Sequence, residues 1–469
     1  MNPTSVELVA LGAWRDEVAS ALAGGARFGG AWATGRIWRA LMIAPGRRQV
    51  LWCETPDGRL DTIIDLVEAV AWDEREAHDL HGFEFTGHEP MRALVAHPDD
   101  LDAWITPVTG DGVHQVAVGP VHAGVIESGH FRFHVVGERI LAMDARLFYK
   151  HRGLERAATG HTPDTALAYA RRACAACAAT NTIAYAHAVE DALGLSPDRE
   201  LRVARTVLLE LERLYNHLHD ISAICAGVGF APGAMAFAAL KDRAQQLNAQ
   251  LTGHRFLFDA VAVGRSDLTL ENPTVEQARS QMRDIRVDAA AAWRELEFAA
   301  SVQARLDGIG ILSHEDVLRL GAVGPAARAA GVHHDARADS PRLWYSGFAS
   351  ARLPEATGDV AARLRIRAAE LETTCDLLEQ LFAGPLAPGV ASADREPQAL
   401  GVGIVESPRG ATTCAVELSG PPSSIARLHL RTGSYANWPA LAHATTGSLL
   451  PDFPLINKSF ELCYACVDR

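Results

Sequence analysis

Apolar residues recur with a helical period through most of the chain beyond residue 160. The clearest case is SPDRELRVARTVLLELERLYNHLHD, residues 196–220. Its apolar face is formed by Val207, Leu211, Leu214 and Leu218. Ser196 is suited to cap this helix, and Pro197 to occupy its first position. Three further stretches show the same period: residues 162–194, 237–261 and 359–382. The pattern predicts a mainly helical large domain.

The front part of the chain has a different pattern. Short apolar segments such as RQVLWCET and TIIDLVEAVAW are separated by the turn sequences APGRR and PDGRL, which is typical of a small α+β domain. The polar stretch WDEREAHDLHGFEFTGHEP closes this part, and its simplest interpretation is a solvated loop. Proline and charge in HPDDLDAW indicate a linker before Gly119. Because this segment is short, we expect the front domain to dock near the cysteine-bearing part of the chain and not to swing free.

The segment HVVGERILAMDARLF predicts strands ahead of the helices, and the tail from Gly401 returns to short strands and loops. We therefore expect an α+β fold class with two domains. The first is a small α+β domain over residues 1–108, and the second is a mainly helical large domain over residues 115–469.

Composition narrows the classes of partner. The chain has 469 residues, and its 44 Lys+Arg against 57 Asp+Glu give a net charge of −13, the opposite of a nucleic-acid binder. No apolar run approaches the roughly 18 to 20 residues that span a bilayer. The N-terminus lacks the basic start and long apolar stretch of a secretory signal. We expect no nucleic-acid partner, and a link to a membrane only through partner subunits.

Four of the eight cysteines form two Cys-x-x-Cys pairs, Cys174/Cys177 and Cys463/Cys466. The first pair lies three apart within a helical pattern, so both thiols can face the same side. The second pair follows near the end of the chain. Two converging pairs make a four-thiolate site, which suits soft or borderline transition metals. By contrast, Cys225 and Cys375 stand alone in apolar helical patterns and are expected to be packing residues.

Three other interpretations of the pairs remain open. Zinc ribbons place their pairs closer together and in turn-rich segments. A thioredoxin-like pair needs a preceding strand and a helix N-terminus beneath it, whereas Cys174 follows a helical sequence. The remaining alternative is four buried cysteines that only pack.

The pairs and their surroundings resemble the large subunit of group 4 nickel–iron hydrogenases of the formate-hydrogenlyase type. The resemblance runs in order from Gly119 onward through GPVHAGVIESGHFRFHVVGERI, LFYKHRGLERA, RRACAACAATNTIAYAHAVEDALG, LLELERLYNHLHDI, GVGIVESPRG, LRTGSYANWPAL and PLINKSFELCYACVDR. The front domain resembles the 30-kDa subunit of complex I through EREAHDLHGFEFTGHEP. A 30-kDa-like domain fused to a 49-kDa-like domain is the arrangement of the formate-hydrogenlyase branch.

The resemblance implies a binuclear nickel–iron centre that carries diatomic ligands. By position, Cys174 and Cys463 correspond to terminal nickel ligands, and Cys177 and Cys466 to the thiolates that bridge nickel and iron. Arg409, in SPRG, corresponds to a guanidinium over the site that acts as base or electrostatic partner.

Other positions are implied around that centre. Ser434 corresponds to a donor to a diatomic ligand on iron. Glu155 corresponds to a carboxylate at a structural magnesium ion or on a proton route, and its alternative is a surface helix charge. His122 and His130 resemble positions that face the proton or quinone-like cavity, and their alternative is a structural histidine.

The chain departs from the family pattern at three places. Ala175 replaces a glycine between the first two cysteines, and its methyl group is expected to crowd the small ligands of the metal. Asn181 replaces a histidine, and an amide cannot shuttle protons near neutral pH. Glu461-Leu462 replaces the usual Asp-Pro before the third cysteine of the set. These changes alter the surroundings of the thiolates but keep all four.

The resemblance implies a catalytic hydrogenase subunit that interconverts protons and H₂. The chain carries no further cysteine cluster for an iron–sulfur centre, so its electrons are expected from an iron–sulfur small subunit like the complex I 20-kDa subunit. A ferredoxin-like subunit, membrane subunits and maturation factors are the other implied partners. The expected location is cytoplasmic, on the inner face of the cell membrane.

Two other functions compete with this one. The first is a non-catalytic 49-kDa-like subunit of a membrane oxidoreductase that lacks nickel, which the changes at Ala175 and Asn181 favour. The second is a zinc-stabilised assembly factor.

Overall fold

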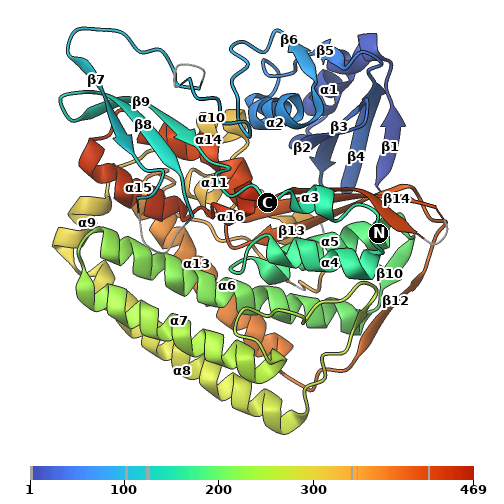
Figure 1. The fold of residues 1–469 in the computed structure, drawn as a ribbon. Coiled ribbons are helices and arrows are strands. Elements are labelled where there is room, and N and C mark those ends of the chain that lie inside the picture. The colour runs from blue at the N-terminus through green and yellow to red at the C-terminus, as the bar shows by residue number, and fades with distance from the viewer. Residues whose placement is uncertain (1–3, 101–103, 123–126, 340–341, 346, 421–422) are drawn as a thin grey trace.

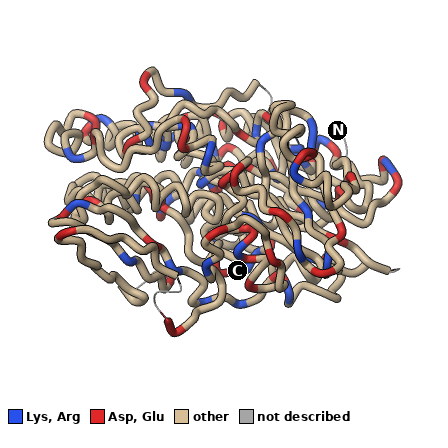
Figure 2. Tube along the Cα trace, turned by 90° about the horizontal axis from the view of Figure 1, so that it is seen from above, with Lys and Arg blue, Asp and Glu red and all other residues tan. Residues whose placement is uncertain are grey.

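The computed structural model shows a small N-terminal domain seated on a larger layered domain (Figure 1). It describes residues 4–100, 104–122, 127–339, 342–345, 347–420 and 423–469. Basic and acidic residues are interspersed along the chain (Figure 2). Among the described residues, no helix combines the length and the apolar composition that crossing a bilayer requires.

The front domain is built on a four-stranded sheet in the order β1-β4-β3-β2. β1 lies parallel to β4, and the other neighbours are antiparallel. Its strands and first helix are β1 (Ser5–Leu8), α1 (Trp14–Ala23), β2 (Arg27–Thr34), β3 (Ile37–Ala44) and β4 (Arg47–Glu54). The core between sheet and helix is formed by buried Trp14, Val18 and Trp38 together with Phe83. The expected α+β character is confirmed.

The acid- and histidine-rich stretch is not a solvated loop. Most of it forms α2 (Ala71–His81), and Asp73, Glu74 and Glu76 on this helix are buried. TIIDLVEAVAW leads into this helix through the short helical turn Glu68–Val70. The small sheet beside α2 consists of β5 (Arg59–Asp61) and β6 (Glu84–Thr86). The acids are buried because each has a partner, as the site below shows.

The large domain opens with an antiparallel sheet, as the sequence predicts. Its strands are β7 (Val113–Val118), β8 (His130–Val136) and β9 (Arg139–Arg146). Phe131 and Phe133 of β8 are buried in the core and both contact Phe453. The Phe131 ring is tilted, with 5.2 Å between ring centroids, and the Phe133 ring is edge-on, with 4.7 Å. This sheet therefore rests on the C-terminal helices, far along the sequence.

A layer of long helices forms the opposite side of the large domain (Figure 1). Its members are α6 (Arg199–Gly227), α7 (Ala231–Thr252), α8 (Asn272–Glu297) and α13 (Val360–Leu381). The helix predicted from Ser196 begins later, because Asp198 caps it through Leu201 N at 2.7 Å. Ser196 and Pro197 lie instead in β10 (Leu195–Pro197), which pairs with β12 (Gly389–Ala393).

The predicted helix over 237–261 ends at Thr252, and Gly253 takes a left-handed conformation there, with φ 81°. Shorter elements complete the large domain. They are α3 (Leu154–Ala157), β11 (Arg265–Ser266), α9 (Ala300–Leu306), α10 (His314–Leu320), α11 (Pro325–Ala329) and α12 (Ala336–Asp339).

The alanine-rich stretch predicted as one helix is two. α4 ends at Arg172 and α5 begins at Ala178, and the first cysteine pair occupies the break. The bounds are α4 (Pro163–Arg172) and α5 (Ala178–Ala192). Alanine favours a helix throughout, so sequence alone gives no stop signal here. Tertiary contacts, not propensity, create the turn.

The tail contains helices as well as the predicted strands. The strands form an antiparallel sheet of β13 (Leu400–Ser407), β14 (Gly410–Ser419) and β15 (Ser424–Arg431). After it come α14 (Gly433–Thr445), a turn at Leu450–Asp452, α15 (Phe453–Phe460) and α16 (Ala465–Asp468). The expectation of loops here is wrong because α14 and α15 bury their apolar residues against the sheet β7-β8-β9.

The two parts of the chain share one apolar cluster. Trp32, Leu41, Ile43 and Val50 of the front sheet pack against residues of β13 and β14. Arg48 donates to Val402 O at 2.6 Å, and Arg39 pairs with Glu417 at 3.1 Å. The front domain is therefore docked on the large domain, as expected from the short connection between them.

Candidate metal centre

The four paired cysteines meet inside the large domain although the pairs lie far apart in sequence. The sulfurs of Cys174, Cys177 and Cys466 lie within 4.8 Å of one another. Cys463 Sγ lies 3.2 Å from Cys174 Sγ and accepts from Cys466 N at 3.4 Å. Three of the four are buried, and Cys463 is half-buried. All four thiols are free, so the cluster is a set of potential metal ligands and not a disulfide.

The first pair is shaped by the turn between α4 and α5. Ala176 O accepts from Tyr215 OH at 2.9 Å and from Asn216 Nδ2 at 2.8 Å, both on α6. Glu212, also on α6, accepts from Ala179 N at 2.7 Å and Thr180 N at 3.1 Å in the first turn of α5. These bonds satisfy amides that every helix start leaves open. α6 therefore sets the position of Cys177, the residue that precedes α5.

The second pair is held by the start of α14. Cys463 N donates to Ser434 Oγ at 3.0 Å, and Thr432 Oγ1 donates to Cys466 O at 3.3 Å. Thr432 also caps α14 through Tyr435 N. Ser434, proposed from sequence as a ligand donor, thus accepts from the backbone of a cysteine.

Arg152 joins the two cysteine segments, and the sequence analysis did not single it out. Its guanidinium donates to Arg172 O and Ala173 O at 2.8 Å each, just before Cys174. It also donates to Ala465 O at 3.3 Å, between the other two cysteines. The available signal was its place in LFYKHRGLERA, a segment that the sequence analysis used only for the family resemblance.

Arg409 lies at the cluster, buried to 4% exposure. It donates to Glu461 O at 2.7 Å, Asn216 Oδ1 at 2.5 Å and Asp220 Oδ1 at 3.1 Å. Although burial acts in the other direction, Asp220 and then the charge of Cys177 raise the pKa of Arg409. A guanidinium fixed by three acceptors presents a permanent positive charge to the sulfurs.

The turn that presents Arg409 depends on a close backbone approach. Gly410 has φ 119°, and a Cβ there would lie 2.7 Å from Gly324 N. Ser407 Oγ accepts from Arg409 N at 3.1 Å and donates to Gly410 O at 2.7 Å. Glycine at position 410 is therefore required by both the conformation and the space.

The thiols share charge. Hydrogen bonds with Cys174 and Cys466 lower the pKa of Cys177 to about 6, and Arg409 acts in the same direction. The corresponding bond to Cys174 raises the pKa of Cys463 to about 12. The cluster alone thus favours one thiolate among hydrogen-bonded thiols. A metal ion bound by all four displaces the remaining protons.

The two substituted positions beside the first pair have different surroundings. Ala175 is exposed, so its methyl group is not buried among the sulfurs, and the crowding expected from the loss of glycine is not found. Asn181 is fully buried one helical turn after Cys177, and neither atom of its amide has a hydrogen-bond partner among the described residues. Buried amides are rarely left so. The residues present therefore fit a bound group that offers a polar atom beside Cys177.

Glu155 is buried, so it is not a surface charge, and the partners described below are not cysteines. It accepts from Arg427 at 2.9 Å, Leu430 N at 2.8 Å and Arg469 Nε at 2.7 Å. Although burial acts in the other direction, the arginines lower the pKa of Glu155 well below its usual range. Glu76, Glu155 and His429 could together hold a cation, and the Arg469 guanidinium bonds to both carboxylates. The positive charge of Arg469 therefore balances these two buried carboxylates.

Of the two histidines, one lies near the cluster. His122 Nε2 lies 3.5 Å from the hydroxyl of Tyr464, the residue that follows Cys463. His130 packs edge-on against Trp104, with 5.2 Å between ring centroids. Burial lowers the pKa of both.

Glu127 is a candidate that sequence reasoning missed. It is half-buried, and burial raises its pKa, with the charge of Cys463 acting in the same direction. It stands in the quoted motif GPVHAGVIESGH, where an acid between apolar residues and a glycine was the available signal.

Asp220 and its neighbours were also missed. Asp220 accepts from Arg367 Nε at 3.1 Å as well as from Arg409, and both arginines lower its pKa although burial raises it. His217, one turn earlier on α6, bonds to Glu370 on α13 at 2.9 Å. The signal was the acids and histidines inside the apolar pattern LLELERLYNHLHD. Helix α6 therefore links the cluster to a buried ionic layer.

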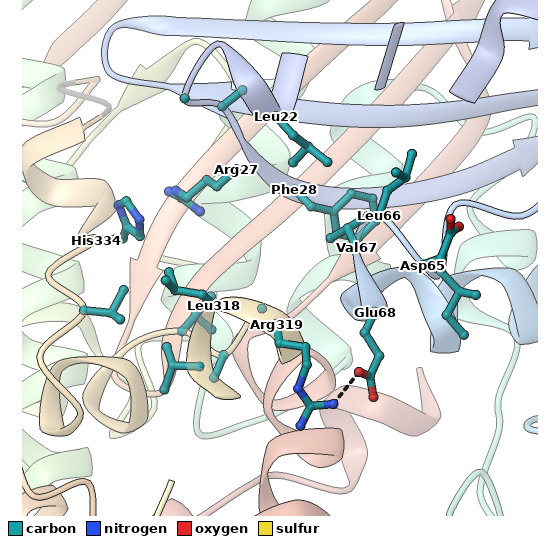
Figure 3. A pocket seen from close by; sticks show the side chains of 18 residues that line it. Leu22, Arg27, Phe28, Asp65, Leu66, Val67, Glu68, Leu318, Arg319 and His334 are labelled. Carbon is teal, nitrogen blue, oxygen red and sulfur yellow. Dashed lines mark hydrogen bonds and ion pairs between the residues drawn. The ribbon is translucent and has the colours of Figure 1, made fainter. Parts of the chain in front are cut away.

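A cavity of about 470 Å³ lies elsewhere, between the front domain and α10 (Figure 3). Arg27 and His334 stand at one end, and the Glu68–Arg319 ion pair stands at another. Phe28, Leu66 and Leu318 line the space between. None of the four paired cysteines lines this cavity.

Models of three known families match the chain. Residues 40–111 match "Respiratory-chain NADH dehydrogenase, 30 Kd subunit". Residues 152–226, with the first cysteine pair, match "Nickel-dependent hydrogenase". Residues 228–396 and 388–469, with the second pair, match "Respiratory-chain NADH dehydrogenase, 49 Kd subunit". The cluster is thus assembled from segments that match two different families.

Relatives of both kinds are similar to the chain. Formate hydrogenlyase subunit 5 of Escherichia coli is 31% identical over 441 residues, 87% of this chain and 76% of that protein. The C/D subunit of the NADH-quinone oxidoreductase of Bacteroides fragilis is 25% identical over 462 residues, 89% of this chain and 86% of that protein. A chain of the membrane-bound sulfane sulfur reductase, an archaeal respiratory membrane complex, aligns with TM-score 0.70 and 25% identity, over 78% of this chain and 100% of that one.

Proposed function

We propose that this chain, which belongs to the formate-hydrogenlyase-type family of group 4 nickel–iron hydrogenase large subunits, catalyses the interconversion of protons and H₂. Its 30-kDa-like and 49-kDa-like complex I domains are fused in one chain. The observation that carries the proposal is the meeting of four free cysteine sulfurs under the Arg409 guanidinium. Buried thiolates beside a fixed positive charge suit a soft metal and an electron-rich reaction.

We assign Cys174, Cys177, Cys463 and Cys466 as the four residues that would hold a nickel–iron centre. When bound, this centre would supply the redox chemistry that splits H₂ into protons and electrons. The 3.2 Å between Cys174 Sγ and Cys463 Sγ supports this assignment, because two sulfurs that bind one metal ion must lie close together. A magnesium ion has no part in this assignment, since Arg469 bonds to Glu76 and Glu155.

The residues around the cysteines would orient and polarise a bound group. Arg409 stays charged at any working pH and faces the thiolates of Cys177 and Cys463. Ser434 uses its oxygen to accept from Cys463 N, which leaves its hydroxyl hydrogen to donate to a diatomic ligand. The partnerless amide of Asn181 offers a second donor beside Cys177.

Protons leave through the side of Cys463. Glu127 is half-buried there, and its raised pKa suits a carboxyl that takes and releases a proton. His122 lies next, against Tyr464. Glu155 does not serve this purpose in our proposal, because Arg427 and Arg469 hold it ionised.

Electrons come from a separate iron–sulfur small subunit, like the 20-kDa subunit of complex I. The half-buried Cys463 and the exposed Ala175 bring the centre close to the surface, which supports an electron donor docked there. We place the chain in a complex with a ferredoxin-like subunit and membrane subunits, on the cytoplasmic face of the cell membrane, after loading by maturation factors.

A second candidate is a non-catalytic 49-kDa-like subunit without nickel. The observation in its favour is that the segment with Cys463 and Cys466 matches the 49 Kd subunit of the respiratory chain. In that case the thiols only pack, and the charge of Arg409 serves the ion pair with Asp220.

Hydrogen evolution with a reduced dye separates the two functions. In the purified native complex, Cys466→Ala should abolish H₂ production because one of the four thiolates that would hold the metal centre is gone. Cys375→Ala, a buried cysteine of α13 outside the cluster, is the matched control and should keep the rate within about twofold of the unmutated complex. Equal rates for Cys466→Ala and the unmutated complex would exclude the catalytic assignment.

A further inference from the structure

Helix α2 of the front domain reaches across the domain boundary with its acidic face. Asp73 and Glu76 are three residues apart and therefore lie on the same side of the helix. Asp73 accepts from Arg431 Nε at 3.2 Å. Glu76 accepts twice from Arg469 Nη2, at 2.7 and 2.8 Å. Both pairs are nearly closed to solvent, with side-chain exposures of 0 to 8%.

The two arginines flank the segments that hold the second cysteine pair. Arg431 directly precedes Thr432, whose hydroxyl donates to Cys466 O. Arg469 lies three residues after Cys466, and Figure 1 shows that end of the chain beneath the front domain. Each ion pair is thus within a few bonds of the backbone that positions Cys466.

An aromatic contact reinforces the same junction. Tyr435, next to Ser434 in α14, meets Trp72 of α2 edge-on at 5.5 Å between ring centroids. The guanidinium of Arg469 lies over the same tyrosine ring at 4.8 Å, and that of Arg431 lies at 5.7 Å. Three neighbouring residues of α2 therefore enclose the start of the helix that bonds to Cys463 N.

We propose that α2 is a positioning element of the cysteine cluster, and that Asp73 and Glu76 act as positioning residues through Arg431 and Arg469. The front domain then fixes the geometry of Cys466 from outside the large domain. The consequence for a metal centre rests on the proposed function, whereas the mechanical link does not.

The same helix supplies a matched control. Glu74 is equally buried, but it accepts from Thr62 Oγ1 at 2.6 Å, Ile63 N at 3.2 Å and His88 Nδ1 at 2.6 Å. All of these partners belong to the front domain. Glu74→Gln therefore disturbs α2 and its domain without touching the arginines of the large domain.

The test measures alkylation of each cysteine in the reduced, metal-free full-length chain by peptide mass spectrometry. Glu76→Gln should raise the rate at Cys466 at least tenfold and leave buried Cys225 and Cys375 within twofold, with Glu74→Gln close to the unmutated chain at all three. Should Glu76→Gln not fold, Arg469→Lys takes its place. This variant keeps the charge but loses the pair of hydrogen bonds to Glu76, and it should show the same selectivity for Cys466. Unchanged rates at Cys466, or equal acceleration at all cysteines, would overturn the proposal.

A spectroscopic arm reports on the consequence for the centre. Co²⁺ added to the reduced chain should give a thiolate-to-cobalt absorption band. For Glu76→Gln, this band should be shifted, or Co²⁺ should bind at least tenfold more weakly. For Glu74→Gln, both the band and the affinity should be unchanged. No band in the unmutated chain would count against the metal centre of the proposed function, while the alkylation comparison would still decide the role of α2. A band identical in all three chains would overturn the role of Glu76.

Discussion

At the scale of single residues, the cluster is determined by side chains that serve two partners at once. Arg409 bonds to backbone, amide and carboxylate groups while it faces the thiolates. Arg152 ties both cysteine segments. The four cysteines and Arg409 could be named from sequence, because paired thiols and a motif mark them. Arg152 and Glu127 also stand in quoted motifs but were not named, because their roles depend on contacts with cysteine segments far along the chain.

The most direct residue-scale prediction concerns Arg409. Arg409→Lys keeps the positive charge but loses the planar guanidinium, so it cannot bond to Glu461 O, Asn216 and Asp220 together. We expect H₂ turnover to fall by about 100-fold or more, the usual effect of losing a fixed electrostatic group, with nickel content and assembly intact. The assay is dye-driven H₂ evolution beside nickel quantification on the same preparation. A nickel-loaded variant with an unchanged rate would remove Arg409 from the mechanism.

At the scale of elements, periodicity found most long helices and strands but not their interruptions. The helix over 359–382 is present as α13, with Asp359 as its cap. The break between α4 and α5 was missed because alanine gives no stop signal, and α6 creates the break through bonds to Ala176 O. The acids of α2 suggested a solvated loop because their arginine partners lie more than 350 residues away.

Glu212 gives an element-scale prediction, because it caps the first turn of α5 from α6. Burial raises the pKa of Glu212 from 4.5 to about 7. The folded chain therefore holds this proton to higher pH than the unfolded chain, and the folded state loses about 3 kcal/mol of stability from this group as pH rises from 4.5 through 7.

Glu212→Gln cannot ionise, so its free energy of unfolding relative to the unmutated chain should rise by about 2.5 kcal/mol between pH 5 and pH 8. Urea unfolding of the metal-free chain, followed by tryptophan fluorescence at both pH values, measures this difference. Glu315→Gln, at an exposed acid of α10, should run parallel to the unmutated chain. A difference for Glu212→Gln that stays constant with pH would contradict the cause given for the shift.

At the scale of the whole molecule, two domains that match different families are packed tightly against each other. The shared cluster around Trp32 and Val402, the bond from Arg48 to Val402 O, and the acidic face of α2 all cross the boundary. The α+β class and the docking of the front domain could be predicted from sequence. The role of that contact at the cysteines could not, because it depends on side chains far apart in the chain.

A nick between the domains tests this unity. Protease cleavage in the segment 106–112, which is mostly exposed or half-buried, should leave both fragments in one peak on gel filtration at physiological salt. The apolar cluster and the buried ion pairs hold them without the covalent link. Elution of the front fragment by itself as a stable species would contradict the docked arrangement.

Metal analysis of the natively matured complex decides whether the cysteine cluster holds nickel and iron. We expect one nickel and one iron per chain beyond the iron of partner clusters. Both should be lost in Cys177→Ala and kept in Cys225→Ala, a buried cysteine of α6 outside the cluster. Nickel absent from the unmutated complex, or present equally in all three, would show that the cluster is not a nickel–iron site.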